Sequence, residues 1–429
     1  MTDFRHEYEH KTVTCGFYGA SVNLATSQEL FSSFEVDPGS SLLLHSVGSR
    51  LDVDSLGTVL DVGCGVGTLA LALAAKNPRL RGTCVDRDAL ALAFTERNAR
   101  ANGIAGVTCL PSLGTSDVPY GDFDLVMSNI PAKAGNPVIE RMLRDFSAAA
   151  SRDGVVAVVI VRTLSDFARD CLVRGGAEIL HEHVTREYTV YHYRGASAPP
   201  ARAPATRDAT VREPGELGVY SRGTFGFSRG GRQWTIDSVF GIPEFDSLDH
   251  ATELGIDLLG NLDLRSLRRA SDEPSRVLVV NPGQGHVPVF LSLATKDDAT
   301  DSSDGTGADG DAPELRVAGR DLLALRATEA AVRAATGDSV ATSHVPWLGR
   351  IDGRFDLVCV NCVKEAVPRA HELLAEDLAR LVEPGGTLVV SGSSTLVQRL
   401  DSVVSADFAR VKDVRRKGCR AVRYERKDR

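Results

Sequence analysis

The sequence predicts an α/β protein with two tandem Rossmann-like domains, each built on a mostly parallel sheet that ends in an antiparallel hairpin. Strand-like apolar segments alternate with helical segments over residues 58–193, which is typical of a parallel sheet covered on both faces. A glycine-rich turn follows the first of these strands. The same order of segments returns after residue 276, so the chain is interpreted as an internal duplication.

Length and composition fit this interpretation. A chain of 429 residues exceeds one ordinary core and predicts two or three domains. No apolar run is long enough for a membrane span and no signal peptide is present, so we expect a cytoplasmic protein. The eight cysteines are scattered, which favours a reducing compartment without a metal site. A net charge of −8 opposes nonspecific binding to nucleic acid but permits a local basic surface.

The first segments precede the sheet. Residues 1–11 are polar and predict a loose terminus, and a strand-like segment follows at 11–18. Pro38 and Gly39 then open a predicted helix over residues 40–45.

The turn after the first strand has three glycines at alternate positions. An apolar run over 59–62 leads to Gly63, Gly65 and Gly67, and a helix is predicted over 69–76. Glycines remove every Cβ from such a turn, so the backbone can approach a nucleotide-like ligand while helix-start amides point at it. A tight turn of small residues without a ligand is the alternative.

Two further strands indicate which nucleotide-like ligand the glycine turn binds. Thr83–Asp86 ends in an acid about twenty residues after the glycines, where a carboxylate reaches a ribose diol. This predicts adenosine without a pyrophosphate. The next strand ends in Asn129-Ile-Pro-Ala, which favours methyl transfer over hydride transfer. The remaining elements are a helix over 88–101, a strand near 107–110, a helix near 138–150, a strand over 154–160, and a hairpin over 177–193.

These motifs resemble those of class I S-adenosylmethionine-dependent methyltransferases, and within them the small methyltransferase family of the RsmC type, which methylates guanine N2 in ribosomal RNA. The resemblance covers roughly residues 12–193. It lies in the stretches Leu60-Asp-Val-Gly-Cys-Gly-Val-Gly67, Val85-Asp-Arg-Asp88, Asn98-Ala-Arg-Ala-Asn-Gly103, Ser128-Asn-Ile-Pro-Ala-Lys-Ala-Gly135 and Phe31-Ser-Ser-Phe-Glu-Val-Asp-Pro-Gly-Ser-Ser-Leu-Leu-Leu44. It implies S-adenosylmethionine as cofactor and no metal.

The resemblance also implies a set of site residues. The Asn129 side-chain oxygen and the Ile130 carbonyl accept the hydrogens of the target amine, while Pro131 stiffens the turn. The residues expected to bind the cofactor are Asp61, Gly63, Cys64, Gly65, Gly67, Asp86, Arg87, Ser112 and Asn129, with Leu113 beside Ser112 at the adenine. Asp37, Gly39 and Ser40 are candidates for the wall of the cofactor site, and a helix N-cap is the alternative.

The chain departs from the family motif at the residue that stacks on the target base. The common motif has an aromatic residue in its fourth place, whereas this chain has Ala132 followed by Lys133. Stacking on a target base is therefore expected from Phe17, Tyr18 or Phe34. Lys133 is a candidate phosphate contact, and a solvated surface lysine is the alternative.

The second copy has lost key residues. It has Val279 in place of Asp61, Asn281 in place of Gly63, Gly319 in place of Asp86 and Val363 in place of Pro131. We therefore expect a degenerate domain that positions RNA or has a structural role. RsmC-type enzymes also pair a working with a degenerate domain, but there the working domain comes second.

The predicted organisation is a catalytic domain at 12–193, a linker at 194–214 and the degenerate domain at 215–429. An acidic insert at 297–311 is expected to be a solvent-facing loop, and the basic segment 410–427 is a candidate RNA contact or a protected edge hairpin.

Three functions remain open from the sequence. The first is a guanine-N2 methyltransferase acting on ribosomal RNA or the small ribosomal subunit, as a monomer. The second is an N-methyltransferase on another planar nitrogen, in adenine or a release-factor glutamine amide. The third is a pseudoenzyme scaffold that binds RNA or a partner. His181 and His183 share a strand face, with an edge of the sheet favoured over a metal site.

Overall fold

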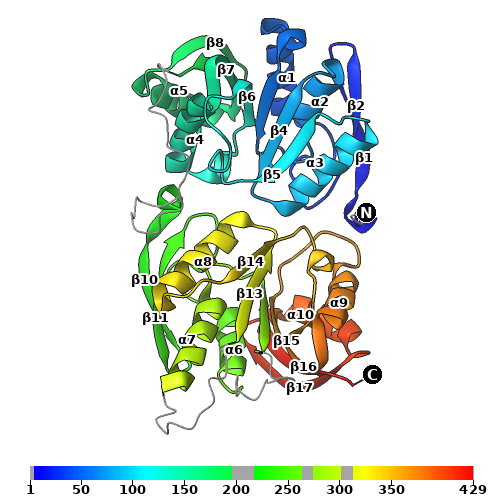
Figure 1. Cartoon of the computed structure of the whole chain (residues 1–429), viewed down its shortest axis with the longest axis vertical. Helices are drawn as coiled ribbons and strands as arrows, with labels where there is room; N and C mark the ends of the chain where they lie inside the picture. The colour runs from blue at the N-terminus through cyan, green and yellow to red at the C-terminus, as the bar shows by residue number, and fades with distance from the viewer. Residues whose placement is uncertain (1–3, 196–216, 263–273, 301–312, 429) are drawn as a thin grey trace. The chain divides into compact units, whose positions relative to one another are not determined.

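The chain folds into two compact units, residues 1–220 and 221–429 (Figure 1). The structure, a computed structural model, describes residues 4–195, 217–262, 274–300 and 313–428. Most of the predicted linker, residues 196–214, lies outside the described residues. Each unit is described by itself.

The first unit contains a seven-stranded sheet. Its strands, in spatial order, are β5 (Val107–Pro111), β4 (Arg81–Asp86), β3 (Thr58–Val62), β6 (Phe123–Asn129), β7 (Ala150–Val161), β9 (Tyr188–Arg194) and β8 (Glu178–Val184). The strands from β5 to β7 pair in parallel, while β9 pairs antiparallel with both β7 and β8. The predicted parallel sheet with a terminal hairpin is confirmed.

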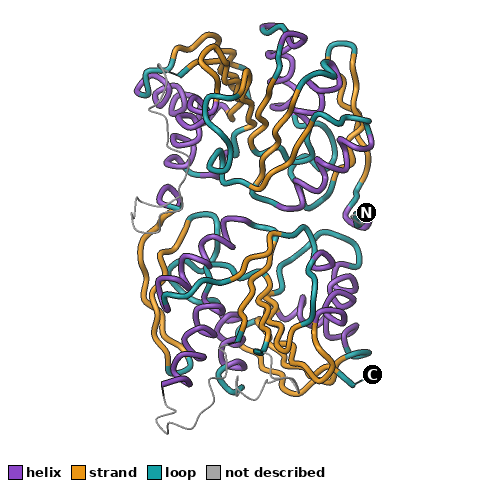
Figure 2. Tube along the Cα trace, viewed as in Figure 1, coloured by secondary structure: helices purple, strands orange, loops and turns teal. Residues whose placement is uncertain are grey.

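Helices cover both faces of this sheet (Figure 2). They are α1 (Pro38–Arg50), α2 (Thr68–Lys76), α3 (Ala89–Ala101), α4 (Asn136–Ala149) and α5 (Ser165–Arg174). On one face α4 and α5 pack against buried strand residues such as Leu60, Val126 and Val158. On the other, Ala70 of α2 packs with Cys84 of β4. The near-continuous apolar strands are therefore explained by burial on both sides.

The N-terminal segment is packed, contrary to our expectation of a loose terminus at 1–11. The described residues there include a short 3-10 helix, η1 (His6–Tyr8), in which Tyr8 is buried. The Arg97 Nε atom donates to Glu9 Oε1 over 2.6 Å. Our expectation was wrong because these contacts reach to α3, which composition alone does not reveal.

A separate hairpin follows, β1 (Lys11–Phe17) and β2 (Ala20–Thr26). The amide of Asn98 in α3 holds β2 like a strand partner: Oδ1 accepts from the Ala25 N–H over 2.9 Å, and Nδ2 donates to the Ala25 carbonyl over 3.0 Å. The hairpin is therefore fixed to the helical layer and leads directly towards α1.

The second unit repeats the first. Its seven-stranded sheet has the corresponding order, β14 (Ala341–His344), β13 (Glu314–Gly319), β12 (Arg276–Val280), β15 (Phe355–Asn361), β16 (Val382–Ser393), β18 (Cys419–Arg426) and β17 (Phe408–Arg416). Its helices are α6 (His250–Leu259), α7 (His286–Thr300), α8 (Leu322–Thr336), α9 (Ala370–Leu381) and α10 (Ser394–Val404). The predicted tandem duplication is confirmed.

The duplication begins earlier than the sequence motifs indicated. The hairpin of β10 (Ser221–Arg229) and β11 (Arg232–Val239) corresponds to β1 and β2, and α6 corresponds to α1. Both helices have an aspartate N-cap: Asp37 Oδ2 accepts from the Ser40 N–H and Asp249 Oδ1 from the Thr252 N–H, each over 2.8 Å.

The acidic insert differs in part from expectation. Helix α7 continues to Thr300, so residues 297–300 are helical rather than part of a loop. Residues 301–312 lie outside the described residues. No helix in the described ranges has the length and apolarity that a membrane span requires.

Candidate functional site

The predicted site residues of the first unit meet at one edge of its sheet. Asp61 lies in β3, Asp86 ends β4 and Asn129 ends β6. These three strands are adjacent and parallel, so their carboxyl ends share an edge. This is the edge at which open α/β sheets bind ligands.

The three glycines of the turn have different constraints. All have positive φ, +74° at Gly63, +57° at Gly65 and +87° at Gly67. A Cβ on Gly63 or Gly65 would meet nothing within 4 Å, whereas one on Gly67 would lie 2.8 Å from Leu71 Cδ1. Gly67 is therefore required by packing against α2. Gly63 and Gly65 leave open space that a ligand can occupy.

Asp61 combines burial with an unused acceptor. Its Oδ2 accepts from the Ala70 N–H over 3.0 Å and so holds the start of α2 against β3. Its Oδ1 is buried and has no hydrogen-bond partner among the described residues. Burial, with a smaller contribution from the charge of Asp86, raises the pKa of Asp61 to about 7, although the Ala70 hydrogen bond opposes the shift.

Asp86 ties the end of β4 to the glycine turn. Its Oδ2 accepts from the Gly65 N–H over 3.0 Å and its Oδ1 from the Asp88 N–H over 2.9 Å. The side chain is partly exposed, and each oxygen has a second lone pair. Burial raises the pKa of this carboxyl to about 6. Arg87, the next residue, is also partly buried.

Asn129 is held by the N-terminus of α1. Its Nδ2 donates to Asp37 Oδ2 over 2.8 Å and to Ser40 Oγ over 3.0 Å. An ionised carboxylate only accepts hydrogen bonds, so the amide nitrogen has to face Asp37. No hydrogen bond to Asn129 Oδ1 is present among the described residues, and this oxygen is free to accept.

The residues around Asn129 are rigid. The Ile130 N–H donates to the Val159 carbonyl over 2.9 Å, which extends the β6–β7 pairing by one residue, and the Ile130 side chain is buried. The Pro131 carbonyl accepts from the Ala134 N–H over 3.0 Å. Lys133 is exposed on the short helix η3 (Ala132–Ala134).

Asp37 caps the N-terminus of α1 and also contacts the Asn129 amide, as Ser40 does. The helix N-cap and the wall of the cofactor site, the two roles that the sequence left open, are therefore compatible. A Cβ on Gly39 would lie 2.9 Å from Asp37 Oδ2 and 3.0 Å from the Tyr188 ring. Gly39 therefore allows this cap to pack closely. No sequence motif indicates the contact between Asp37 and Asn129.

Ser112 and Cys64, two of the residues expected to bind the cofactor, have buried side chains. Ser112 is buried, and its hydroxyl accepts from the Asp117 N–H over 3.2 Å; its neighbour Leu113 is buried as well. Cys64 is buried in a cluster with Cys84. The turn at Cys64 can therefore offer its backbone to a ligand, but its thiol points into the core.

The aromatic candidates separate by exposure. Phe17 is only 4% exposed, so its expected role in stacking is wrong: β1 turns this side chain inward. The Tyr18 ring packs against α1, where its hydroxyl donates to the His45 carbonyl over 3.3 Å. Phe34 is 60% exposed, and Phe31, which sequence reasoning did not single out, is 72% exposed. Both lie on the segment that leads to Asp37.

Two pairs of side chains, Cys359 with Cys362 and His181 with His183, have the chemistry of metal ligands. The described residues contain no group of three or more His, Cys, Asp or Glu side chains that could hold a metal. Burial raises the pKa of Cys359 and Cys362, which makes these thiols unreactive. The His181 and His183 rings stack at 6.3 Å on the edge strand β8.

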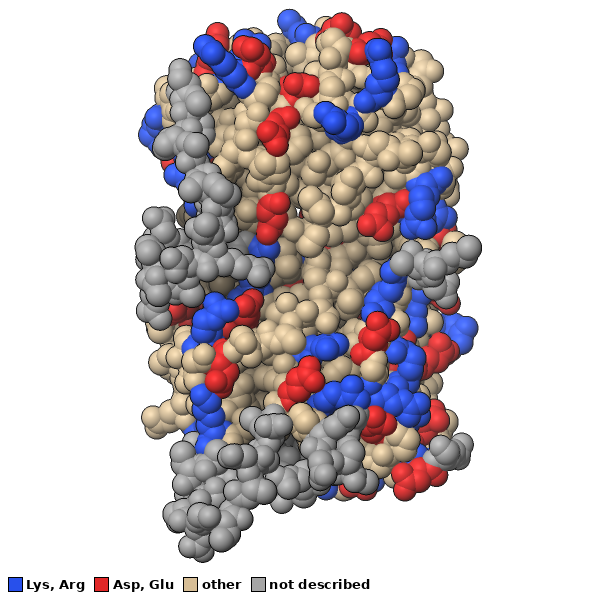
Figure 3. All heavy atoms as spheres, viewed as in Figure 1, with Lys and Arg blue, Asp and Glu red and all other residues tan. Residues whose placement is uncertain are grey.

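The basic closing hairpin of the second unit is partly paired with acidic side chains. Arg420 is buried between Asp401 and Asp413, with both distances 2.8 Å. Arg410 also pairs with Asp401, and Arg416 pairs with Glu253. On the face visible in Figure 3, acidic side chains are interspersed with basic ones. Residues 410–427 still contain nine Lys and Arg against two acidic residues, so the RNA contact and the protected edge hairpin both stay predictions.

Comparisons with known proteins show what the first unit is similar to. Residues 21–191 match the family model of the methyltransferase small domain. The chain is 29% identical over 195 residues to the ribosomal RNA small subunit methyltransferase C of Shewanella piezotolerans, covering 44% of this chain and 53% of that protein. It is 39% identical over 115 residues to the protein of the same name from Klebsiella pneumoniae, covering 27% and 32%. The chain thus spans between about a third and about half of these curated relatives.

A solved structure extends the likeness to both units. The T. thermophilus 16S rRNA N2 G1207 methyltransferase (RsmC), solved in complex with AdoMet and guanosine, matches with a TM-score of 0.65. The match covers 99% of this chain and 100% of that chain at 16% identity. The tandem architecture is therefore shared as a fold.

Proposed function

We propose, on the premise that residues 21–191 are a methyltransferase small domain of the RsmC type, that the protein transfers a methyl group from S-adenosylmethionine to the exocyclic N2 of a guanine in small-subunit ribosomal RNA. We propose further that it acts as a monomer in the cytoplasm and that the first unit is the working domain.

The residues at the sheet edge fit the donor. The unpartnered Asp61 Oδ1 is an acceptor for its ammonium group, and the partly exposed Asp86 carboxylate has lone pairs left for the ribose hydroxyls. The open space over Gly63 and Gly65 is available to the methionine part. The second unit lacks both acids, because Val279 and Gly319 stand in their places.

The chemistry that bound S-adenosylmethionine supplies is an electrophilic methyl carbon. The protein's task is then to orient an amine towards that carbon, because an exocyclic amine is conjugated with its ring and is a weak nucleophile. Hydrogen bonds from the amine to two acceptors favour a localised lone pair. Asn129 Oδ1 and the Ile130 carbonyl are the proposed acceptors.

The observation that carries this proposal is the fixed orientation of the Asn129 amide. Asp37 and Ser40 both bind Nδ2, so Oδ1 is the atom left to accept a hydrogen bond. A neutral oxygen acceptor at this position suits a planar N–H₂ group. Phe34 and Phe31 are the proposed stacking surfaces, and Lys133 is the proposed phosphate contact.

The test is transfer of a tritiated methyl group by the full chain. Undermethylated small ribosomal subunits, free ribosomal RNA, DNA and release factors are offered in parallel, and the modified nucleoside or residue is identified after digestion. We expect N2-methylguanosine from ribosomal RNA, and loss of transfer in Asn129→Ala. Label in adenine or in a release factor would assign methylation of another planar nitrogen. No transfer to any substrate would favour the pseudoenzyme scaffold.

A further inference from the structure

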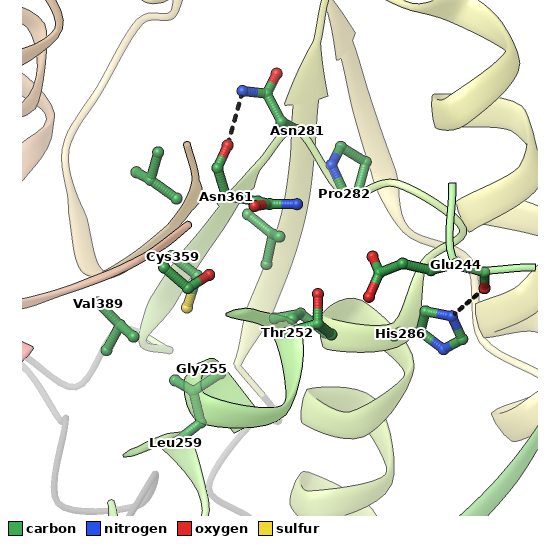
Figure 4. Close-up of a pocket in the computed structure, with 14 residues that line it drawn as sticks. Glu244, Thr252, Gly255, Leu259, Asn281, Pro282, His286, Cys359, Asn361 and Val389 are labelled. Carbon is green, nitrogen blue, oxygen red and sulfur yellow. Dashed lines mark hydrogen bonds between the residues drawn. The ribbon is translucent and has the colours of Figure 1, made fainter. Parts of the chain in front are cut away.

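The second unit has a small open pocket at the carboxyl ends of β12 and β15 (Figure 4). Its polar lining includes Glu244, Thr252, Asn281, Asn361 and Ser391. Because the two units share one strand order, this is the position that Asp61 and Asn129 occupy in the first unit.

The pocket is opened by a missing side chain in α6. Counted from the N-caps Asp37 and Asp249, Gly255 of α6 corresponds to Leu43 of α1. Leu43 is fully buried, whereas Gly255 lines the pocket. A Cβ on Gly255 would lie 3.4 Å from Ser391 of β16, so even a small side chain would begin to fill the space.

The amide at the strand end has been kept while the donor-binding acids have been lost. Asn361 ends β15 as Asn129 ends β6. Its backbone carbonyl accepts from Asn281 Nδ2 over 3.1 Å, which fixes the strand end. Among the described residues no hydrogen bond to the Asn361 side-chain amide is present, so this group remains available to a ligand.

A carboxyl group faces this amide. Figure 4 shows the side chains of Glu244 and Asn361 directed towards each other across the pocket, with Thr252 below them. Glu244 has a φ of +63° and lies five residues before its N-cap, as Ser32 with a φ of +62° does in the first unit. A positive φ therefore occurs at the matching position of both segments, where the second unit has a carboxyl side chain and the first has a hydroxyl.

The Glu244 carboxyl has spare acceptor capacity. Its Oε1 accepts from the Asp249 N–H over 3.0 Å, and no ion pair to it is present among the described residues. Burial, followed by the charge of Asp249, raises its pKa to about 7, although hydrogen bonds from the Asp249 N–H and Thr252 oppose the shift. A buried carboxyl without a cation is favourable only when donors satisfy it.

The pocket offers no positive charge. It has no Lys or Arg among its lining residues. His286 is neutral because burial lowers its pKa to about 4, and both ring nitrogens are engaged, by the Glu244 carbonyl at 3.0 Å and by Trp234 Nε1 at 3.3 Å. An anion is therefore disfavoured, and the entering group has to bring hydrogen-bond donors.

We propose that this pocket binds the Watson–Crick edge of a guanine, with Glu244 accepting from N1–H and the N2 amine and the Asn361 amide donating to O6. Guanine is the one standard base with two adjacent donors on that edge, which matches a carboxylate. The pocket is small, so we propose that only this edge of the base enters it. The inference rests on the proposed function in taking an RNA guanine other than the target as the occupant; free guanosine has the same chemistry.

The experiment measures guanosine binding to the full chain by calorimetry. The Asn129→Ala substitution is present throughout, so that the site of the first unit does not contribute. We expect guanosine to bind at one site, inosine, which lacks the N2 amine, to bind about tenfold more weakly, and adenosine not to bind. Adding Glu244→Gln is expected to lower guanosine affinity about tenfold or more, whereas adding Glu376→Gln, at an exposed position on α9, leaves it unchanged.

A second variant guards against misfolding. Gly255→Ala adds one methyl group 3.4 Å from Ser391, an ordinary contact, and is expected to weaken guanosine binding with a thermal unfolding midpoint close to that of the parent. Guanosine affinity is also expected to rise between pH 6 and pH 8, as Glu244 ionises. No guanosine binding by the Asn129→Ala chain, equal binding of adenosine, or no effect of Glu244→Gln overturns the proposal.

Two further measurements are needed. One distinguishes RNA from free guanosine as the occupant of the pocket, and the other distinguishes failure of the pocket proposal from failure of the proposed function. Single-stranded RNA that binds through Glu244, and weakens when its guanines are replaced by inosine, assigns the pocket to RNA; guanosine binding without RNA binding assigns it to the free nucleoside. If the unsubstituted chain transfers no methyl group but the Asn129→Ala chain binds guanosine through Glu244, the proposed function fails and the pocket assignment stands.

Discussion

The Nδ2 atom of Asn129 lies 2.8 Å from Asp37 Oδ2, although the two residues are 92 positions apart in the chain. The same carboxylate oxygen accepts the Ser40 N–H and caps α1. One aspartate therefore stabilises a helix start and orients the amide that we propose as the acceptor for the target amine. Asp37 and Ser40 are positioning residues in this scheme.

Asp37→Ala is expected to lower kcat for methyl transfer by about ten- to a hundredfold, because the Asn129 amide loses the partner that sets its direction. The KM for S-adenosylmethionine should change little. Loss of the cap lowers the free energy of unfolding by about 1 kcal/mol. Asp321→Ala, which removes the cap of α8 in the second unit, is the matched control and should lower stability without lowering kcat. Equal kcat losses in the two variants would argue for a purely structural role.

The affinity for S-adenosylmethionine should depend on pH through the ionisation of Asp61 and Asp86. Burial raises the pKa of Asp61 to about 7 and that of Asp86 to about 6 in the free protein. A donor that binds their ionised forms must displace protons below these values, so affinity is expected to rise from pH 5.5 to 8 and then level off. Calorimetry in buffers of different ionisation enthalpy measures the released protons. Asp61→Asn and Asp86→Asn should each flatten the profile, and an unchanged slope in both variants would refute the assignment.

The titration of Asp61 should also affect the stability of the protein. Stability is expected to fall as pH rises, whereas donor affinity rises. Its folded-state pKa lies above the unfolded value of 3.8, so the folded protein binds more protons in between. The stability contributed by the protonated form is therefore complete below about pH 4 and is lost as pH rises through about 7. Denaturant unfolding at pH 5 and pH 8 measures this difference. In Asp61→Asn the decline should be smaller, whereas Asp54→Asn, at an exposed position, should leave it intact.

The glycines of the turn should separate binding from folding. Gly65→Ala costs about 1 kcal/mol of stability for its positive φ, but its Cβ enters open space and should weaken donor binding about tenfold or more. Gly67→Ala places a Cβ 2.8 Å from Leu71 Cδ1 and is expected to lower stability further. Thermal unfolding and donor calorimetry of both variants check this. A Gly65→Ala chain with full donor affinity would remove the glycine turn from the site.

Sequence alone predicted the parts of the structure that depend on local pattern. The apolar strands β3, β6 and β7 were recognisable because both faces of the sheet are covered, and the turn at Gly63 because glycine adopts closely spaced positive φ values most readily. Asn129 followed from its place at a strand end.

The remaining features depend on long-range packing. The contact of Asp37 with Asn129 joins segments that only the folded sheet brings together, and no local pattern encodes it. Phe17 was misjudged because β1 belongs to an isolated two-stranded hairpin, where alternation does not say which face is covered. The repeat of the hairpin and of α6 was missed because few identical residues remain, although the N-cap Asp249 was a usable signal.

Phe34 should contribute to RNA binding without contributing to the fold. Its ring is 60% exposed, it makes an edge contact with His10 at 4.8 Å between ring centroids, and it lies three residues before Asp37. Stacking of one base on an aromatic ring contributes about 1–3 kcal/mol, so Phe34→Ala is expected to raise the KM for ribosomal RNA about tenfold. The thermal midpoint and donor affinity should stay the same. Val173→Ala on α5, at a residue 55% exposed, is the control for loss of surface apolar area and should leave the KM unchanged. If both variants raise the KM equally, a general surface effect accounts for the change and stacking on Phe34 does not.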